Sequence, residues 1–243
     1  MTKRVFDVVI SSILLILSLP LCLIAVIGIK LSSKGPVIYK AQRTGKNNTI
    51  FTMYKFRTMH VQTKNTNFIT AANDPRIFAF GKILRNLKID EIPQLINVLL
   101  GDMSLVGPRP QDPNIVKKHY TVLGMETFRV APGLTSPGSI YYYTHAAKQL
   151  DSDDNEKIYV EKLLPIKLAL DIVYIRKASF AYDLKLIWRT LIVILCILIG
   201  KKTFKEPPEM DEARRLLEYY DIRSENAKVG HHQSVLSNQS ISL

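Results

Sequence analysis

Two neighbouring carboxylates, Asp90 and Glu91, are the residues in this 243-residue chain with the clearest capacity for chemistry. Pro93 follows them, and proline favours the first turn of a helix, where its missing N–H is not needed. Apolar residues then recur at helical spacing, at Ile92, Leu95, Ile96 and Leu99. Gly101 marks the expected end of this helix. The pair is therefore predicted at a helix N-terminus, where an ionised carboxylate can act as a nucleophile, bind a hard cation or simply cap the helix.

Cations lie on both sides of this pair in the sequence. Arg85 precedes it and Arg109 follows it, and arginine binds phosphate through parallel N–H groups. Two cations further upstream, Lys55 and Arg57, are candidates for the same role, although a solvated strand face is the alternative for them. Arg109 is flanked by two residues that stiffen its loop, Pro108 and Pro110. Together these residues predict a site for a polyanionic substrate.

Residues 85–110, which contain this cluster, closely resemble the bacterial sugar transferase family. Its members are monotopic phosphoglycosyl transferases that start polysaccharide and glycan assembly. The resemblance includes three further motifs, at Lys3–Asp7, Tyr54–Met59 and Asp74–Ile77. It covers about residues 3–204, and several ordered motifs over this length make it specific.

The resemblance implies a two-step phosphoryl transfer. Asp90 attacks the sugar-bearing phosphorus of a nucleotide diphosphate sugar, expected to be UDP-linked, and polyprenyl (undecaprenyl) phosphate then accepts the sugar phosphate. Magnesium is the expected cofactor, with Asp90 and Glu91 as candidate ligands, because it neutralises diphosphates and prefers oxygen donors. Glu91 could instead handle a proton of the incoming phosphate. The expected phosphate-binding residues are Lys55, Arg57, Arg85 and Arg109.

Two segments depart from the family pattern. Lys88 and Ile89 stand where members usually carry Ser-Leu, so an additional lysine neighbours the acid pair. Residues 132–138 also differ, in a region that bears on donor recognition. The sugar is therefore open, as are the glycan pathway (exopolysaccharide, lipopolysaccharide or capsule) and self-association as a homo-oligomer.

Two other functions are compatible with the same residues. A membrane phosphohydrolase would cleave diphosphate substrates with these carboxylates and a metal ion, without a covalent adduct. A non-catalytic scaffold of a polysaccharide assembly complex would not need Asp90 at all.

The bulk composition limits the partners. A net charge of +12 and a pI near 9.6 suit nucleic acid, anionic lipid or phosphorylated substrates. Nucleic acid is not expected, because the chain has no zinc-finger or RNA-recognition motif and its apolar content is high. Cys22 and Cys196 both lie in apolar runs and are interpreted as buried free thiols.

The segment from Val8 to Ile29 has 22 residues without a charge, which is long enough to cross a bilayer. Pro20 interrupts it near the middle, and Ser18 could satisfy backbone groups that are freed there. Positive residues flank both ends, at Lys3, Arg4, Lys30 and Lys34. Because positive flanks favour the cytoplasmic side, we expect a re-entrant helix hinged at Ser18 and Pro20 in the bacterial inner membrane, with a bitopic anchor as the alternative.

The predicted fold class is α+β, mainly helical, with a re-entrant membrane helix, a small β-hairpin and interfacial amphipathic helices on the cytoplasmic face. The hairpin is predicted from Pro36–Gln42 and Thr49–Arg57, and a short strand from Ser139–Tyr143. Helices are predicted at residues 77–87, 115–120 and 126–130, from Asp151 to about Lys177 with Pro165 inside, in the apolar run Leu184–Gly200, and at 209–220. The expected domains are residues 1–35 (membrane helix and junction), 36–204 (catalytic domain) and 205–243 (polar, partly disordered tail).

Overall fold

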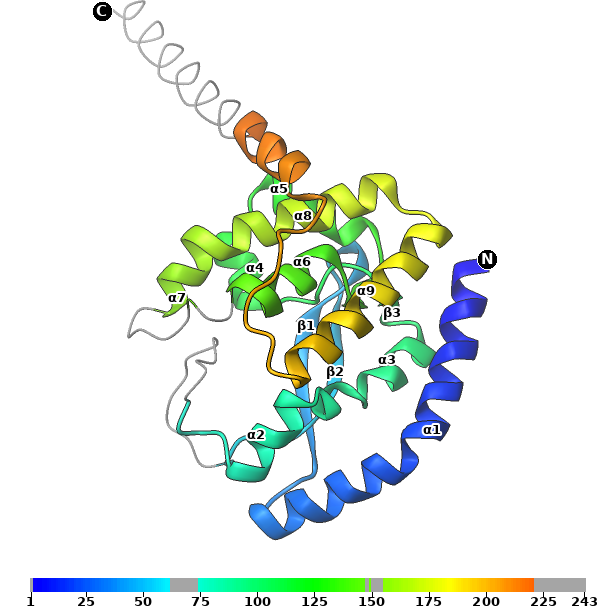
Figure 1. Cartoon of the computed structure of the whole chain (residues 1–243). Helices are drawn as coiled ribbons and strands as arrows, with labels where there is room; N and C mark the ends of the chain where they lie inside the picture. Colours follow the sequence, from blue (N-terminus) through cyan, green and yellow to red (C-terminus); the bar gives the residue numbers. More distant parts are fainter. Residues whose placement is uncertain (1, 62–73, 147–148, 150–154, 221–243) are drawn as a thin grey trace, which may run out of the picture.

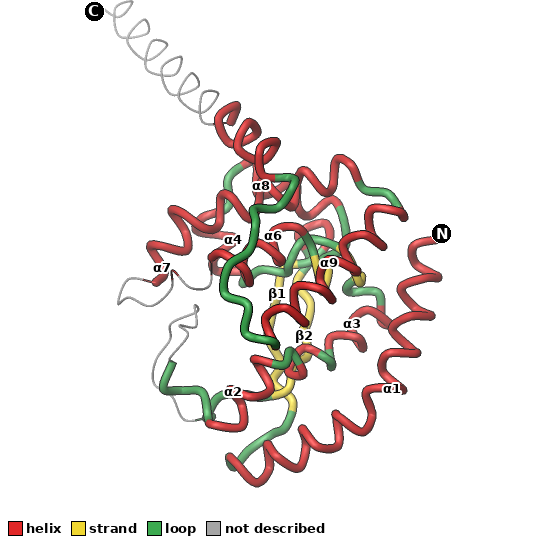
Figure 2. Tube along the Cα trace, viewed as in Figure 1, coloured by secondary structure: helices red, strands yellow, loops and turns green. Residues whose placement is uncertain are grey.

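The computed structural model describes residues 2–61, 74–146, 149 and 155–220. The fold is mainly helical, and its strands form two small sheets near the centre of the molecule (Figure 1, Figure 2). The predicted mainly helical class is confirmed. Residues 221–243 of the predicted tail lie outside the described residues, as does the expected helix start at Asp151.

The β-hairpin is confirmed. Strands β1 (Ile38–Thr44) and β2 (Ile50–Phe56) pair antiparallel over their whole length. Asn47 and Asn48 turn the chain with φ angles of 55° and 60°, a left-handed conformation that asparagine tolerates better than most residues. The N–H of Gly45 closes the turn by donating to the carbonyl oxygen of Thr49 at 2.7 Å.

The N-terminal helix α1 (Thr2–Ser32) leaves most of its apolar side chains exposed. By length and composition it could cross a membrane. The helix contains Pro20 and bends near its middle (Figure 1), as expected because proline removes a backbone hydrogen bond and crowds the preceding turn. The hydroxyl of Ser18 donates to the carbonyl oxygen of Leu15 at 3.0 Å, whereas the carbonyl that loses its helical donor at Pro20 is that of Ile16.

Both ends of α1 are bound to the same globular body. Near its start, Arg4 donates to the carbonyl oxygen of Leu99 in helix α3 (Gln94–Leu100) at 2.7 Å. One turn later, the buried carboxylate of Asp7 accepts from the hydroxyl of Ser104 at 2.8 Å. Just beyond its end, the backbone oxygen of Ser33 accepts from Arg57, which follows β2, at 2.7 Å.

The chain reverses sharply before the acid pair. Helix α2 (Ala79–Asn86) is followed by Lys88, whose φ of 59° is unusual for a residue with a side chain, and then by the 3₁₀ turn η2 (Ile89–Glu91). The acid pair was predicted at a helix N-terminus, and it lies in η2, directly before α3, which begins one residue after Pro93. Gly101 ends α3 with a φ of 96°, as predicted.

The middle of the chain contains short helices and one incorrectly predicted element. Helix α4 (Pro113–His119) and the 3₁₀ turn η3 (Glu126–Arg129) agree with the predicted helical pieces, and the short helix α5 (Val122–Met125) between them was not predicted. The predicted strand is wrong: helix α6 (Pro137–Tyr141) and a π turn, η4 (Tyr142–Ala146), occupy it. Ser136 caps α6 by accepting the N–H of Ser139 at 3.0 Å, and this cap overrides the strand propensity of the aromatic run.

The buried core centres on helix α8 (Leu164–Lys177). It follows α7 (Asn155–Ile158) and a π turn, η6 (Tyr159–Leu163), and contains Pro165 in its first turn, where proline is tolerated. The helix over residues 210–220 packs its apolar side onto this core, which confirms the amphipathic helix predicted there.

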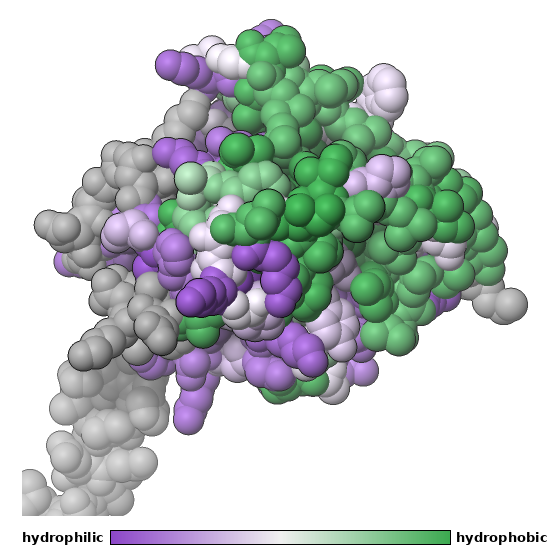
Figure 3. Space-filling view, turned by 90° about the horizontal axis from the view of Figure 1, so that it is seen from below, coloured by the Kyte–Doolittle hydropathy of each residue, from purple (hydrophilic) through white to green (hydrophobic). Residues whose placement is uncertain are grey.

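Helix α9 (Phe180–Leu198) contains the second apolar run and ends before Gly200, whose φ is 88°. A row of its large apolar side chains is exposed: Phe180, Leu184, Trp188, Leu191, Ile192, Leu195 and Leu198. Its start meets α1, where the rings of Phe6 and Phe180 pack edge to face at 5.1 Å. Hydrophobic side chains form a broad area on the face seen in Figure 3.

A parallel pair of three-residue strands was not predicted. Strand β3 (Ser104–Val106) pairs with β4 (Gly133–Thr135) and joins the loop after α3 to the segment before α6. The pairing holds the next loop, which contains Arg109, beside the acid pair.

Candidate active site

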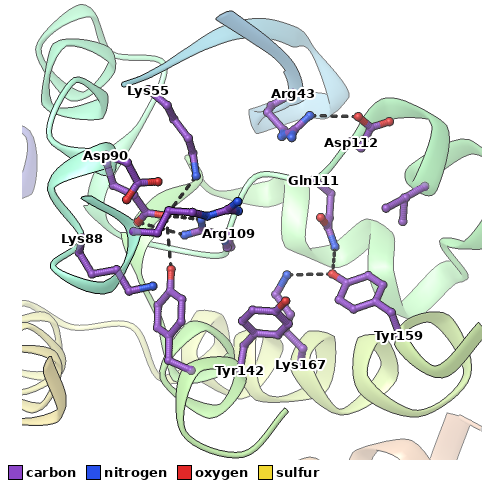
Figure 4. Close-up of a pocket in the computed structure, with 14 residues that line it drawn as sticks. Arg43, Lys55, Lys88, Asp90, Arg109, Gln111, Asp112, Tyr142, Tyr159 and Lys167 are labelled. Atoms are coloured by element: carbon purple, nitrogen blue, oxygen red, sulfur yellow. Dashed lines mark hydrogen bonds and ion pairs between the residues drawn. The ribbon is translucent and has the colours of Figure 1, made fainter. Parts of the chain in front are cut away.

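A cavity of about 290 Å³ opens beside the acid pair (Figure 4). Its walls come from segments far apart in the sequence: the hairpin, the turn between α2 and α3, the loop after β3, the π turns η4 and η6, and α8. The structure brings five of the predicted site residues together here, namely Lys55, Arg85, Asp90, Glu91 and Arg109.

Protein partners contact Glu91 mainly through one of its two carboxylate oxygens. Its Oε1 accepts from Lys55 Nζ at 3.1 Å and from Arg109 Nη2 at 2.5 Å, and the hydroxyl of Tyr143 lies 3.5 Å away. Burial would raise the pKa of Glu91, but Arg109, Lys55 and Lys88 outweigh burial and hold this pKa well below its usual range. These contacts favour the ionised form of Glu91, and its carboxylate holds two cations in place.

Asp90 has the opposite environment. Its side chain is buried, with 6% of the residue exposed, and it makes no hydrogen bond or ion pair with any residue that the structure describes. Burial and then the charge of Glu91 raise the pKa of Asp90, while Lys55, Lys88 and Arg85 act against this shift. A buried carboxylate without a committed partner is poorly solvated and so well suited to attack an electrophile.

Lys88 is held against an aromatic ring. Its Nζ lies 3.6 Å from the ring centre of Tyr143, a close cation–π contact. Burial lowers the pKa of Lys88 to about 8, although Glu91 and Asp90 favour its charged form. Tyr143 thus contacts both Lys88 and Glu91, and sequence reasoning missed it because its run resembled a strand.

The other cations of the site differ in their pKa shifts and in their hydrogen-bond partners. Glu91 raises the pKa of Arg109 in spite of its burial, whereas burial lowers the pKa of Lys55 in spite of Glu91. Arg85 lines the cavity, and its buried Nη1 has no hydrogen-bond partner among the described residues. Arg85 is therefore the predicted phosphate-binding residue with the most donor capacity to spare.

Arg57 was predicted to bind phosphate, but it is not part of this site. It does not line the cavity, and all three of its guanidinium nitrogens are occupied elsewhere. They donate to the backbone oxygens of Pro36 at 2.6 Å and Ser33 at 2.7 Å, and to the Ser33 hydroxyl at 2.8 Å. The predicted strand included Arg57, but β2 ends at Phe56 and the chain then turns toward the end of α1.

The predicted loop-shaping prolines flank Arg109 in a packed segment. The carbonyl oxygen of Pro108 accepts from the N–H of Gly133 at 2.8 Å, and both Pro108 and Pro110 are buried. A Cβ atom at Gly107 would lie only 2.4 Å from the backbone oxygen of Ala131, so any side chain there would collide with it. The loop therefore lies directly on the backbone before β4.

The far end of the cavity contains residues that sequence analysis did not select. Arg43 is paired with Asp112 at 3.0 Å, and Gln111 donates to the hydroxyl of Tyr159, which lies 3.3 Å from Lys167 Nζ (Figure 4). The sequence contained one indication of Lys167, because it is a lysine within the apolar run of α8 and lysine is rarely buried without a partner.

Comparison with known proteins identifies related sequences. Residues 1–196 match the family described as bacterial sugar transferase. The chain is 36% identical over 196 residues to the undecaprenyl-phosphate glucose phosphotransferase of Komagataeibacter xylinus, covering 78% of this chain and 35% of that protein. It is 36% identical over 193 residues to the UDP-glucose:undecaprenyl-phosphate glucose-1-phosphate transferase of Caulobacter vibrioides, covering 78% and 68%.

A third relative carries a different sugar in its name. The chain is 35% identical over 196 residues to the UDP-N-acetylgalactosamine-undecaprenyl-phosphate N-acetylgalactosaminephosphotransferase of Aeromonas hydrophila, covering 79% of this chain and 43% of that protein. The chain thus spans less than half the length of the Komagataeibacter and Aeromonas relatives.

Proposed function

The chain belongs to the bacterial sugar transferase family, and from this premise we propose that it transfers a sugar 1-phosphate from a nucleotide diphosphate sugar to membrane polyprenyl phosphate. The names of its relatives contain undecaprenyl phosphate and UDP-linked sugars, which supports a UDP-sugar donor and an undecaprenyl phosphate acceptor. The product starts the assembly of a polysaccharide or glycan.

The contrast between Asp90 and Glu91 is the observation that carries this proposal. In the first step an oxygen of Asp90 attacks the sugar-bearing phosphorus. The bond from this phosphorus to the bridging oxygen breaks, and its electron pair leaves with the nucleoside monophosphate. An aspartyl sugar phosphate remains on Asp90, and no proton needs to move.

In the second step an oxygen of the polyprenyl phosphate attacks the same phosphorus. The bond to Asp90 breaks, its electron pair returns to the carboxylate, and the polyprenyl diphosphate sugar is formed. A phosphate dianion attacks with its own lone pair, so this step does not require a general base. The low pKa of Glu91 agrees with this assignment, because a carboxylate held ionised by Arg109 and Lys55 is a weak proton acceptor.

We assign Glu91 a positioning role. It orients Lys55 and Arg109, and Arg85 and Lys88 approach the same carboxylate pair from the α2 side. In a phosphoryl transfer these cations stabilise charge on the non-bridging oxygens, which is where catalysis mostly acts.

Magnesium fits the donor set of this site. The described residues contain no group of three or more metal-ligating side chains. Magnesium in phosphoryl-transfer sites, however, is commonly held by one or two carboxylates together with substrate phosphates and water. Asp90 would be the main protein ligand, with the less engaged Oε2 of Glu91 beside it. When bound, the ion neutralises the diphosphate.

We further propose that α1 is re-entrant and that the exposed apolar row of α9 lies in the interface of the inner membrane, on its cytoplasmic face. Support comes from the two anchored ends of α1, since Arg4 and Ser33 both contact one globular body. A helix that crossed the bilayer would separate those ends. Positive residues at both flanks favour the same side.

The test is a panel of donors, including UDP-glucose and UDP-N-acetylgalactosamine, with the protein in detergent and magnesium. Without acceptor, the matching donor should release one equivalent of uridine monophosphate (UMP) and increase the protein mass by one sugar phosphate. Adding undecaprenyl phosphate should restore the original mass and allow turnover. Asp90→Asn should abolish the mass increase.

The matched control is Asp211→Asn, an aspartate on the 210–220 helix whose side chain is 86% exposed. It should retain both the adduct and turnover. Continued UMP release without acceptor and without an adduct would indicate a phosphohydrolase instead, and full activity of Asp90→Asn would contradict the proposal.

A further inference from the structure

The active-site cavity contains a buried amine, that of Lys167, which the mechanism above does not use. Lys167 has only 4% of its surface exposed, yet it lines the cavity. Its one hydrogen-bond partner among the described residues is the hydroxyl of Tyr159, at 3.3 Å. A buried ammonium group normally needs an opposite charge in contact with it.

The protein does not supply that contact in the described residues. Asp171 lies one helical turn further along α8 and attracts Lys167 through space, but no described carboxylate lies within 4 Å of Lys167 Nζ. Asp171 is committed to another partner, since its Oδ1 accepts the N–H of Gly138 at 2.9 Å. Lys167 therefore has donor capacity directed into the cavity and charge that a ligand can compensate.

The position of Lys167 relative to Asp90 is informative. Asp90 lines the cavity from the turn between α2 and α3 and Lys167 lines it from α8, and the side chain of Arg109 lies between them in Figure 4. In an in-line displacement the leaving oxygen is on the opposite side of the phosphorus from the nucleophile. The nucleoside monophosphate then departs on the side of the phosphorus that faces away from Asp90, and Lys167 lines the part of the cavity beyond Arg109 (Figure 4).

On this basis, and resting on the proposed function, we infer that Lys167 binds the phosphate of the leaving nucleoside monophosphate. As the bond to the bridging oxygen breaks, the electron pair stays on that oxygen, and the ammonium group of Lys167 stabilises the added negative charge without giving up a proton. The hydroxyl of Tyr159, held by Gln111, orients the amine from the other side.

The experiment measures the binding of two probes, UMP and uridine, to the full chain in detergent by calorimetric titration. Lys167→Gln should bind UMP roughly ten- to a hundredfold more weakly than the wild type, the range expected for losing a hydrogen bond to a charged group. Uridine, which lacks the phosphate, should bind both proteins equally. Lys167→Arg should regain most of the UMP affinity.

Lys162→Gln is the matched control, because this lysine lies on the preceding π turn and is exposed. It should bind UMP like the wild type. Equal UMP affinity in Lys167→Gln and wild type would overturn the inference, and so would an equal loss for UMP and uridine, which would indicate a structural effect. If Lys167→Gln does not fold, Tyr159→Phe replaces it and should weaken UMP selectively.

These outcomes are independent of the proposed function. The covalent adduct on Asp90 is measured by mass in an experiment separate from the UMP titration. If no adduct formed, the proposed reaction would be contradicted, but the UMP-binding result would still hold. If the wild type formed the adduct and Lys167→Gln bound UMP as tightly as the wild type, the inference about Lys167 would be contradicted and the proposed function would still hold.

Discussion

At the scale of single residues, the different surroundings of the two acids predict opposite effects on stability. Asp90→Asn removes a buried charge that has no described partner and that repels Glu91, so the variant should be as stable as the wild type or more stable. Glu91→Gln leaves Lys55 and Arg109 without their counter-charge. It should lower the free energy of unfolding by roughly 2–4 kcal/mol, measured by denaturant titration in a fixed detergent.

This value is set below the roughly 3–5 kcal/mol typical of breaking a buried pair, because the side chains of Glu91, Lys55 and Arg109 keep 15%, 19% and 21% of their surface exposed. Asp211→Asn on the surface serves as the reference. A result in which both acid variants lose stability equally would contradict the environments described for them.

The raised pKa of Asp90 predicts the acid side of the pH–rate profile. The carboxylate must be ionised to attack, so adduct formation should fall as the pH drops through this pKa, at a higher pH than for an exposed aspartate. Lys55→Gln removes a cation that favours the ionised form, and the fall should move to still higher pH. The readout is the initial rate of UMP release against pH.

Lys40→Gln, on an exposed position of β1, provides the comparison and should leave the profile unchanged. A profile of Lys55→Gln that moves to lower pH would show that Lys55 does not act on Asp90 in this way.

The sequence was enough to predict the acid pair and its cations, because local spacing and a family motif place them. It also showed that Lys88 departs from the family pattern. The division of labour between Asp90 and Glu91 could not be predicted, since it depends on Lys55 and Arg109, which reach Glu91 from 36 and 18 residues away. The same holds for Lys167, which meets the cavity only through the packing of α8.

At the scale of elements, Arg57 connects the end of α1 to the hairpin. Arg57→Gln should lower the free energy of unfolding by about 2–4 kcal/mol, because it removes several charged hydrogen bonds at a residue that is only 5% exposed. UMP affinity should stay unchanged, since Arg57 does not line the cavity. Thermal unfolding and UMP titration on the same sample check both expectations.

Arg129→Gln is the control for removing an arginine, because Arg129 is exposed at the end of η3. A large loss of UMP affinity in Arg57→Gln would instead indicate that Arg57 contributes to the binding site.

Elements with a consistent periodicity and clear stops were predictable. The hairpin, α3, α8 and α9 follow from alternation, helical spacing and their terminal glycines or prolines. The segment at Ser139–Tyr143 was not, because β-branched and aromatic residues favour a strand while the preceding Ser136 and Pro137 start a helix. Tertiary packing of Gly138 against Asp171 decides between them.

At the scale of the whole molecule, the two anchored ends of α1 predict its topology. Single cysteines at positions 2 and 34, in a background with Cys22 and Cys196 replaced, should both react with a membrane-impermeant thiol reagent from the cytoplasmic side. The reason is that Arg4 and Ser33 contact the same body. The measurement compares labelling in intact cells and in inverted vesicles.

A cysteine at Lys118, on the exposed end of α4, gives the reference side for the globular body. Position 2 reacting only from the opposite side would support a bitopic anchor and exclude the re-entrant arrangement.

The double attachment of α1 also bears on how the protein reaches its final state in the cell. Moving an arginine or lysine through the hydrocarbon centre costs about 2.5–3.5 kcal/mol per residue even by the most permissive scale. In the proposed re-entrant arrangement both flanks stay on one side, so Lys3 and Arg4 would not have to make that passage. Biogenesis would then require only that the apolar bend of α1 enters one leaflet, and no polar segment would need to cross the membrane.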